Sequence, residues 1–448
     1  MTKLFGTDGI RGKANIFPLD ETSMELLGYT LGTIIGGVSG NQPEVIIGYD
    51  TRESSINIFE SISRGFNKCK GKIMNAGTIS TPVVSFLASY FKQYAIAITA
   101  SHNPYEDNGI KIFAPGGLKL SEDKEYVIEE GLLRRNIFQE STSFAPLIID
   151  INQRAYELYY EELIRKNFPA LDLQGMHIAI DVAHGAGYHL IPCILGKLGG
   201  TIIIHNNTPN GKNINHQCGA LHPEYLSQCI LNTDINPGIS YDGDADRAIF
   251  SDNTGKIYDG DMILAIIGLY LKGKGLLKNN TIIATIMSNY GLEKYLISNG
   301  IHLVRVPVGD KYVLEKMMEL KVNLGGEQSG HIILSDLLKT GDGLLTTLMI
   351  LSIMKELQCS LHEMIKGFER FPQILVNVKT KNKVPIENIP ELFNAYNEIL
   401  HKLQENGRII IRYSGTEPLL RIMIEGHNYQ EISAYAEMLS SIAHKHLS

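Results

Sequence analysis

Cysteine and charged blocks are scarce in this sequence, and their scarcity narrows what the protein can be. Cysteine occurs at five scattered positions without a C-x-x-C pair, which argues against a disulfide framework and a thiolate zinc site. No block of like charge occurs in a chain whose net charge is −7. We therefore expect neither nucleic acid nor an anionic membrane surface as a partner.

A long apolar segment is also missing. The longest apolar run, Met262 to Leu271, is far shorter than the roughly 20 residues that span a bilayer. The opening residues, MTKLFGTDGIRG, lack the apolar core of a signal peptide. We therefore expect a cytoplasmic protein with no membrane partner.

The pattern of what is present indicates a repeated α/β architecture. A chain of 448 residues is too long for one core, since domains hold about 100 to 200 residues. Short β-rich runs alternate with helical patterns, which is typical of βαβ units and mainly parallel sheets. The same order recurs three times. The third β-rich run of each unit contains or precedes a polar motif: YAIAITAS, GISYDGDADRAIF and VNLGGEQSGHIIL.

After residue 370 the pattern changes to a small α+β domain with an antiparallel sheet, including a helix expected from Ile386 to Glu405. The predicted fold class is α/β, with three tandem mixed α/β domains of similar topology plus a C-terminal α+β domain. We place the domains at residues 1–152, 153–254, 255–370 and 371–448. Ligands of open α/β sheets bind at the carboxyl ends of strands, so we expect the three polar motifs to meet in one cleft.

The segment DGDADR is a candidate metal site. Its aspartates lie at every second position, which in an extended backbone puts Asp242, Asp244 and Asp246 on one face. Oxygen ligands favour Mg²⁺ or Ca²⁺ over zinc. A calcium EF-hand loop would need glycine and glutamate where this chain has Arg247 and Asn253. The alternative is a solvated acidic turn, although the following apolar run, AIFSD, indicates a strand.

The segment RYSGTEPLLR offers backbone N–H groups, hydroxyls and guanidinium groups that together suit a phosphate. These groups belong to Arg412, Ser414, Gly415, Thr416 and Arg421. A plain hairpin turn is the alternative. Arg247, beside the aspartates, could likewise hold a phosphate oxygen near a metal.

The segment GGEQSGH places Glu327 and Ser329 between glycines, where a polyol can approach the backbone closely. A tight turn explains this segment equally well. His331 is either a proton-transfer group or a structural histidine. In NHQCGALH, two histidines and a cysteine have metal-like spacing but no fourth ligand nearby, so we expect no zinc there.

Ser101, in TASHNPYEDNGIKIF, has two interpretations. It has no G-x-S-x-G elbow and no Ser-His-Asp order, so a hydrolase triad is not supported. It could simply cap a turn set by Asn103 and Pro104. Because the other motifs fall at equivalent strand ends, the serine is also well placed to carry a phosphoryl group.

These four motifs resemble, in order and spacing, the signature motifs of the α-D-phosphohexomutases, over essentially the whole chain. FGTDGIRGKA, GEQSGH, NINHQCGALHPE and VGDKYV are most similar to the bacterial phosphoglucosamine mutase branch. The resemblance implies four domains in a heart-shaped arrangement around a central cleft. It also implies interconversion of glucosamine 6-phosphate and glucosamine 1-phosphate, which feeds UDP-N-acetylglucosamine and peptidoglycan synthesis. Phosphomannomutase or phosphoglucomutase activity is the alternative within the superfamily.

The resemblance further implies one Mg²⁺ per subunit and glucosamine 1,6-bisphosphate, or a similar compound, as phosphoryl primer. Small sugar phosphates are the expected partners, and a homodimer is left open. Ser101 matches the phosphorylated serine and, with the three aspartates, the metal ligands. The residues that match other functional positions are His102, Lys111 and Arg247 near the transferring group, Glu327 and Ser329 at the sugar, Arg412, Ser414, Gly415, Thr416 and Arg421 at the substrate phosphate, and Arg11 at the active-site phosphate.

Two positions depart from the branch's pattern. Ala245 replaces a glycine in the metal loop, which is tolerated if its backbone φ is negative. Lys311 stands where arginine is common, so a bidentate phosphate contact is in doubt, while Asp310 supports the phosphoglucosamine branch. The general base is left open between Lys111, His331 and Asp310.

Two functions from other classes are less well supported. A catalytically silent sugar-phosphate sensor would keep the phosphate loop but would not need Ser101. A nucleotide-sugar transferase with an Asp-x-Asp motif would need a nucleotide site, and the sequence has no glycine-rich dinucleotide fingerprint.

Overall fold

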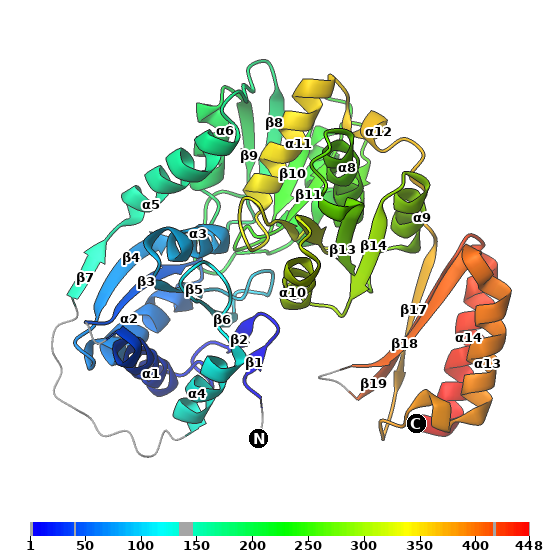
Figure 1. Cartoon of the computed structure of the whole chain (residues 1–448), viewed down its shortest axis with the longest axis horizontal. Helices are drawn as coiled ribbons and strands as arrows, with labels where there is room; N and C mark the ends of the chain where they lie inside the picture. Colours follow the sequence, from blue (N-terminus) through cyan, green and yellow to red (C-terminus); the bar gives the residue numbers. More distant parts are fainter. Residues whose placement is uncertain (1–2, 40–41, 134–146, 415–417, 448) are drawn as a thin grey trace. The chain divides into compact units, whose positions relative to one another are not determined.

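The computed structural model describes residues 3–39, 42–133, 147–414 and 418–447 (Figure 1). The chain forms two compact units: Met1–Met287 with Ile301–Lys366, and Ser288–Gly300 with Gly367–Ser448. None of the described helices combines the length and apolarity that crossing a membrane requires.

The larger unit begins with a mixed sheet in the order β1-β2-β6-β5-β3-β4-β7. Strands β3, β4, β5 and β7 are parallel to one another. Strand β6 pairs antiparallel with β5, β2 pairs antiparallel with β6, and β1 pairs antiparallel with β2. The inner strands are apolar on both faces because helices cover the sheet. The strands are β1 (Phe5–Gly6), β2 (Gly9–Lys13), β3 (Glu44–Tyr49), β4 (Lys72–Thr78), β5 (Tyr94–Ile98), β6 (Asp107–Phe113) and β7 (Leu147–Asp150).

Two smaller sheets of the same unit repeat this plan, in the orders β12-β11-β10-β8-β9 and β14-β13-β15-β16. Their strands are β8 (His177–Asp181), β9 (Thr201–His205), β10 (Gly238–Tyr241), β11 (Ala248–Ser251) and β12 (Ile257–Tyr258), then β13 (Thr281–Thr285), β14 (His302–Val306), β15 (Leu324–Gly326) and β16 (Ile332–Leu334).

The repeat is visible in the pairing of its strands. The orders β6-β5-β3-β4, β11-β10-β8-β9 and β16-β15-β13-β14 are equivalent. In each, the third strand runs parallel to the first and antiparallel to the strand that follows it. The three polar motifs occupy the three equivalent connections, β5–β6, β10–β11 and β15–β16. The predicted threefold α/β repeat is therefore confirmed.

Helices connect the strands of the larger unit. Tight packing of α1 on α2 requires glycine, because a Cβ at Gly28 would lie 2.1 Å from the Ile62 carbonyl oxygen. The helices are α1 (Glu21–Ser39), α2 (Glu53–Asn67), α3 (Thr81–Phe91), α4 (Glu122–Leu133), α5 (Asn152–Leu158) continued by a π-helical segment (Tyr159–Arg165), α6 (Leu190–Lys197), α7 (Pro223–Ile230), α8 (Gly260–Gly273), α10 (Asp310–Leu320), α11 (Gly343–Leu357) and α12 (Leu361–Met364).

The smaller unit has an antiparallel sheet in the order β17-β19-β18, as predicted. We predicted a helix from Ile386 to Glu405, and both of its predicted boundaries are wrong. Pro390, which has no N–H to donate, begins the α-helix, and Gln404 ends it with a φ of 45°. The elements are α9 (Tyr290–Ser298), β17 (Gln373–Lys379), α13 (Pro390–Leu403), β18 (Gly407–Tyr413), β19 (Leu419–Gly426) and α14 (Tyr429–Leu447).

Candidate active site

Ser101 lies in the connection between β5 and β6, where it is almost fully buried. Its hydroxyl donates to Asp242 Oδ2 at 2.7 Å and lies 3.1 Å from His102 Nδ1. Its N–H donates to Thr99 Oγ1 at 2.9 Å, and its φ is 53°. The Asn103 N–H bonds the Ala100 carbonyl, so the expected turn is present and holds a serine whose polar groups all have defined partners.

The three aspartates of DGDADR converge on one point. Their carboxylates are buried, and one ligand oxygen from each lies within 4.8 Å of the others. The extended backbone that we predicted for them is wrong. The segment is a turn between β10 and β11, closed by the Ala245 N–H bonding the Asp242 carbonyl at 3.0 Å. The carboxylates meet because the loop turns, not because they alternate along a strand.

Ala245 adopts a positive φ of 58°. We expected alanine to be tolerated here because of a negative φ, and that expectation is wrong. A left-handed residue other than glycine costs roughly 1–2 kcal/mol. Hydrogen bonds hold the residue in place, because its N–H reaches Asp242 and its carbonyl accepts from the Gly343 N–H at 3.0 Å.

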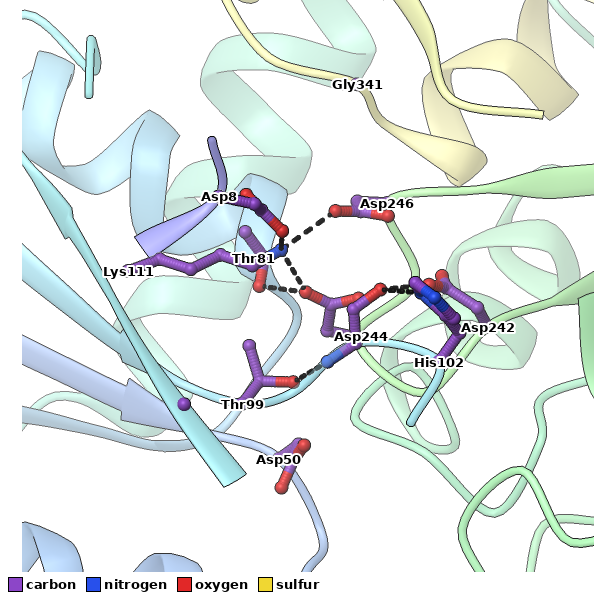
Figure 2. A network of polar contacts seen from close by, with 12 residues as sticks. Asp8, Asp50, Thr81, Thr99, His102, Lys111, Asp242, Asp244, Asp246 and Gly341 are labelled. Atoms are coloured by element: carbon purple, nitrogen blue, oxygen red, sulfur yellow. Dashed lines mark hydrogen bonds and ion pairs between the residues drawn. The ribbon is translucent and has the colours of Figure 1, made fainter. Parts of the chain in front are cut away.

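The ammonium of Lys111, on β6, lies among three carboxylates, two of them from the DGDADR loop (Figure 2). Its Nζ lies 2.8 Å from Asp244 Oδ2, 3.0 Å from Asp246 Oδ2 and 3.1 Å from Asp8 Oδ2. Burial lowers the pKa of Lys111, but the three carboxylates outweigh it and raise the pKa well above its usual value. The amine is therefore held in its charged form.

Two further residues lie beside the aspartates. Arg247 Nε is 3.9 Å from Asp242 Oδ2 and 3.8 Å from Asp246 Oδ1. His102 faces the Ser101 hydroxyl, and burial together with the cations Arg247 and Arg11 lowers its pKa to about 4. The imidazole next to the serine is therefore neutral at neutral pH.

His331 joins the cluster from the third repeat. Its Nδ1 lies 3.5 Å from Asp246 Oδ1, and its Nε2 lies 3.8 Å from Asp310 Oδ2 and accepts from the Gly341 N–H at 3.1 Å. Burial lowers the pKa of His331, but the carboxylates raise it to about 9. The hydrogen bond from the Gly341 N–H opposes protonation of His331, because it requires an unprotonated Nε2. The same bond favours the neutral tautomer whose Nδ1–H faces Asp246.

The GGEQSGH segment connects β15 to β16 and adjoins the aspartate loop, since the Ala248 N–H bonds the Gly330 carbonyl at 3.2 Å. Glu327 Oε1 accepts from the Gly309 N–H at 3.2 Å. The Ser329 hydroxyl is buried and has no hydrogen-bond partner among the described residues. A buried hydroxyl without a partner is free to bond a polar ligand.

Arg11, Asp310 and the second departure, Lys311, each have a polar partner in the larger unit. Arg11, on β2, pairs with Asp8 and donates to Asn103 Oδ1 at 3.4 Å, next to the Ser101 turn. Asp310 accepts from Lys119 Nζ at 2.6 Å. The Lys311 ammonium lies 2.8 Å from Glu122 of α4, so in this structure it is engaged in an ion pair.

The RYSGTEPLLR segment connects β18 to β19 in the smaller unit. Arg412 and Arg421 are directly opposed across these strands, and burial with the charge of Arg421 lowers the pKa of Arg412. Two cations on one face repel each other, so an anion between them would be favourable. The Ser414 N–H bonds the Leu419 carbonyl at 2.8 Å. The predicted contacts Gly415 and Thr416 lie outside the described residues.

Sequence reasoning missed four residues that contact the aspartates, Lys111 or the Ser101 turn. Thr81 Oγ1 donates to Asp244 Oδ2 at 2.6 Å from a position 163 residues away, for which no local signal exists. Asp8 lies within the FGTDGIRG motif, where an acidic residue three positions before Arg11 was a usable signal. Arg52 and Asn215 bond the carbonyls of the Ser101 turn.

The aspartates fit a hard divalent cation. Asp244 Oδ1 and Asp246 Oδ1 are buried and have no hydrogen-bond partner in the described part of the chain. Burial and the two neighbouring carboxylates raise the pKa of Asp242 well above its usual value. Asp246 differs, because Lys111, His331 and Arg247 outweigh burial and lower its pKa well below the usual value. The unpartnered oxygens and the raised pKa of Asp242 indicate room for one more positive charge, and an oxygen-only donor set suits a hard divalent cation.

Family models and relatives agree with this architecture. Models for phosphoglucomutase/phosphomannomutase α/β/α domains I, II and III match residues 2–136, 157–255 and 259–371, and the model for the C-terminal domain matches residues 375–442. A phosphoglucosamine mutase from Bdellovibrio bacteriovorus is 39% identical, covering 100% of this chain and 99% of its own. Another, from Thermodesulfovibrio yellowstonii, is 40% identical and covers 100% of both chains.

Solved structures share the fold. A phosphoglucomutase/phosphomannomutase family protein from Burkholderia thailandensis has a TM-score of 0.80 at 20% identity, covering 98% of this chain and 97% of its own. An N-acetylphosphoglucosamine mutase from Aspergillus fumigatus, solved with GlcNAc-6P and magnesium, has a TM-score of 0.66 at 17% identity, covering 99% and 96%. At these identities the likeness concerns the fold alone.

Proposed function

Because this chain belongs to the phosphoglucomutase/phosphomannomutase family, we propose that it interconverts glucosamine 6-phosphate and glucosamine 1-phosphate. Its full-length similarity to phosphoglucosamine mutases supports that substrate over glucose or mannose phosphates. The observation that carries the proposal is the Ser101 hydroxyl, 2.7 Å from Asp242 within a buried three-aspartate cluster. The product would feed UDP-N-acetylglucosamine and peptidoglycan synthesis in the cytoplasm.

The reaction proceeds in two transfers. In the first, the bond between Ser101 Oγ and phosphorus breaks while the free sugar hydroxyl forms a bond to the same phosphorus, giving glucosamine 1,6-bisphosphate. The sugar hydroxyl loses a proton and Ser101 Oγ gains one. The bisphosphate then turns around, and its other phosphoryl group returns to Ser101. Glucosamine 1,6-bisphosphate, or a similar compound, would phosphorylate Ser101 initially.

Charge neutralisation and alignment are the main catalytic tasks in such a transfer. Lys111 and Arg247 would neutralise the phosphoryl oxygens, and the neutral His102 lies beside the serine. Asp242, Asp244, Asp246 and the Ser101 phosphate would hold one Mg²⁺. When bound, this ion supplies further positive charge at the transferring group.

A proton acceptor for the sugar hydroxyl is also needed. The raised pKa of Lys111 suits charge stabilisation rather than proton removal. His331 and Asp310 are the other candidates at the edge of the aspartate cluster. The raised pKa of His331 and the hydrogen bond that its Nε2 accepts from Gly341 count against His331 in the same way, so Asp310 is the acceptor that we propose.

Substrate recognition would be divided between two loops. Glu327 and Ser329 would bond the sugar hydroxyls, using the Ser329 hydroxyl that has no partner in the described chain. Arg11 would approach the transferring phosphate. The substrate's other phosphate would bind the loop of the smaller unit, through Arg412, Ser414, Gly415, Thr416 and Arg421.

We retain the domain divisions after residues 152, 254 and 370 as a prediction. Whether the protein forms a homodimer is a question for solution measurements.

Coupled assays with glucosamine, glucose and mannose 1-phosphates test this function. We expect glucosamine 1-phosphate to be turned over fastest, and Ser101→Ala to be inactive. Intact mass should show one added phosphoryl group after incubation of the wild type with glucosamine 1,6-bisphosphate, and none in the variant. Faster turnover of glucose or mannose phosphate would reassign the substrate. Turnover by unmodified wild type without any bisphosphate would contradict the phosphoserine mechanism.

A further inference from the structure

The carbonyl oxygens of the Ser101 turn are held by two side chains from different repeats. Arg52 Nη2 donates to the Ser101 carbonyl at 3.0 Å and to the Asn103 carbonyl at 2.8 Å. Asn215 Nδ2 donates to the same two carbonyls, at 2.9 Å and 3.2 Å. Asn215 is the first residue of NHQCGALH, the segment in which we expect no zinc.

Arg52 is fixed by its surroundings. Its guanidinium is fully buried and pairs with Asp50, Nε to Oδ2, at 2.8 Å. Its Nη1 donates to the carbonyls of Pro104 and Asp107. A buried arginine whose Nη1 and Nη2 groups donate to one turn while its Nε pairs with Asp50 cannot move without leaving donors and a charge unpaired. Arg52 therefore determines where the backbone of residues 101–107 lies.

Asn215 is equally fixed, from the second repeat. It is buried, and its own N–H donates to the Ala183 carbonyl at 3.0 Å. The aspartate loop passes directly over the contact, because a Cβ at Gly243 would lie 2.6 Å from the Ser101 carbonyl oxygen and 2.7 Å from Asn215 Nδ2. The Asn215 amide thus ties the serine turn to the repeat that supplies the aspartates.

We propose that Asn215 and Arg52 are positioning residues for phosphoryl transfer, which hold Ser101 in its left-handed conformation so that its hydroxyl faces Asp242. A left-handed serine is unfavourable on its own. The hydrogen bonds that Arg52 and Asn215 donate to the carbonyls of Ser101 and Asn103 offset this conformational cost. The inference rests on the proposed role of Ser101 as phosphoryl carrier.

Asn215→Ala tests the inference, with Asn213→Ala as the matched control. Asn213 lies in the same loop, but its side chain bonds only Thr208 and Asn210 in the described structure. Displacing a reacting group by about 1 Å can reduce the rate about 100-fold. We therefore expect Asn215→Ala to lower kcat by about 10- to 100-fold with KM changed less than about twofold, and Asn213→Ala to leave both unchanged.

Hydrogen–deuterium exchange provides a readout that does not depend on activity. Amides of residues 99–108 should exchange faster in Asn215→Ala than in Asn213→Ala. Asn215→Asp, which keeps the side chain's size but removes the N–H donor, should show the same two effects if the alanine variant does not fold. Arg52→Lys, which keeps the charge opposite Asp50 but loses the forked donors, should also lower kcat.

The outcomes separate this inference from the proposed function. A wild type without mutase activity would reject the function, while the exchange comparison would still decide whether Asn215 orders the turn. With an active wild type, equal kcat values for the Asn215 and Asn213 variants would overturn the inference. A reduced kcat with unchanged exchange at residues 99–108 would overturn it as well.

Discussion

Lys111 Nζ lies 2.8 Å from Asp244 Oδ2, and both side chains are almost fully buried. The same ammonium contacts Asp246 and Asp8, so one lysine compensates three carboxylates. Two of these carboxylates are the proposed metal ligands. Lys111 and a divalent cation therefore supply positive charge to the same cluster, and removing one should make the protein depend more on the other.

Replacing Lys111 with methionine should therefore destabilise the protein strongly when no divalent cation is present. Breaking a buried ion pair by removing one partner costs about 3–5 kcal/mol. We expect Mg²⁺ to raise the Tm of Lys111→Met by more than it raises the Tm of the wild type. Thermal unfolding with EDTA and with Mg²⁺ measures both shifts.

Lys311→Met is the matched control for this measurement. Lys311 pairs with Glu122, whose side chain is 74% exposed, and such pairs contribute about 0–1 kcal/mol. A small change in Tm that does not depend on Mg²⁺ is expected. Equal Mg²⁺ effects on wild type and Lys111→Met would show that the cation does not bind at the aspartates.

Ala245→Gly should stabilise the aspartate loop. Alanine there has a φ of 58°, which glycine adopts without the Cβ clash, although glycine also loses more entropy on folding. The net gain should be about 0.5–1 kcal/mol. Urea unfolding of the variant measures it. Ala179→Gly, within strand β8, should instead destabilise the protein, and a loss of stability in Ala245→Gly would show that the strain is relieved in another way.

The repeat could be predicted because hydrophobic periodicity is a local property of the sequence. Each unit's third strand ends in a polar motif, so the sequence also placed Ser101, the aspartates and Glu327 at equivalent connections. The family resemblance added roles to these positions, but it did not predict their geometry.

The turn at Ala245 and the contacts of Thr81 and Asn215 could not be predicted in this way. Each depends on segments that meet only in the folded chain: Thr81 bonds Asp244 across 163 residues, and Asn215 bonds Ser101 across 114. No periodicity or spacing encodes such hydrogen bonds. The positive φ of Ala245 likewise follows from the bonds its peptide groups make with Asp242 and Gly343.

Asp342 should make stability depend on pH between about 4 and 6. It caps α11, accepts from the Tyr159 hydroxyl at 2.6 Å, and burial raises its pKa to about 6. The unfolded chain releases this proton near pH 4 and the folded protein only near pH 6. Stability due to this group is therefore full below about pH 4 and is lost as the pH rises through 6, by up to about 3 kcal/mol.

Asp342→Asn removes this dependence while keeping an oxygen to cap the helix. Urea unfolding from pH 4 to pH 7 should show the variant gaining stability relative to wild type as the pH rises. Asp252→Asn is the control, because hydrogen bonds from Thr254 and Tyr258 outweigh burial and lower the pKa of Asp252. Its difference from wild type should change only below about pH 4. A flat profile for Asp342→Asn would mean that Asp342 is ionised throughout the range.

Ser329→Ala should weaken substrate binding without weakening the fold. The hydroxyl is buried and has no partner among the described residues, so its removal breaks no hydrogen bond within the described protein, and stability should stay within about 0.5 kcal/mol. If it bonds a sugar hydroxyl, its loss costs about 1 kcal/mol of binding, which raises KM about fivefold. Ser335→Ala is the control, since that hydroxyl already bonds the Val322 carbonyl. A destabilised Ser329→Ala with unchanged KM would place the Ser329 hydroxyl in the fold rather than in the sugar site.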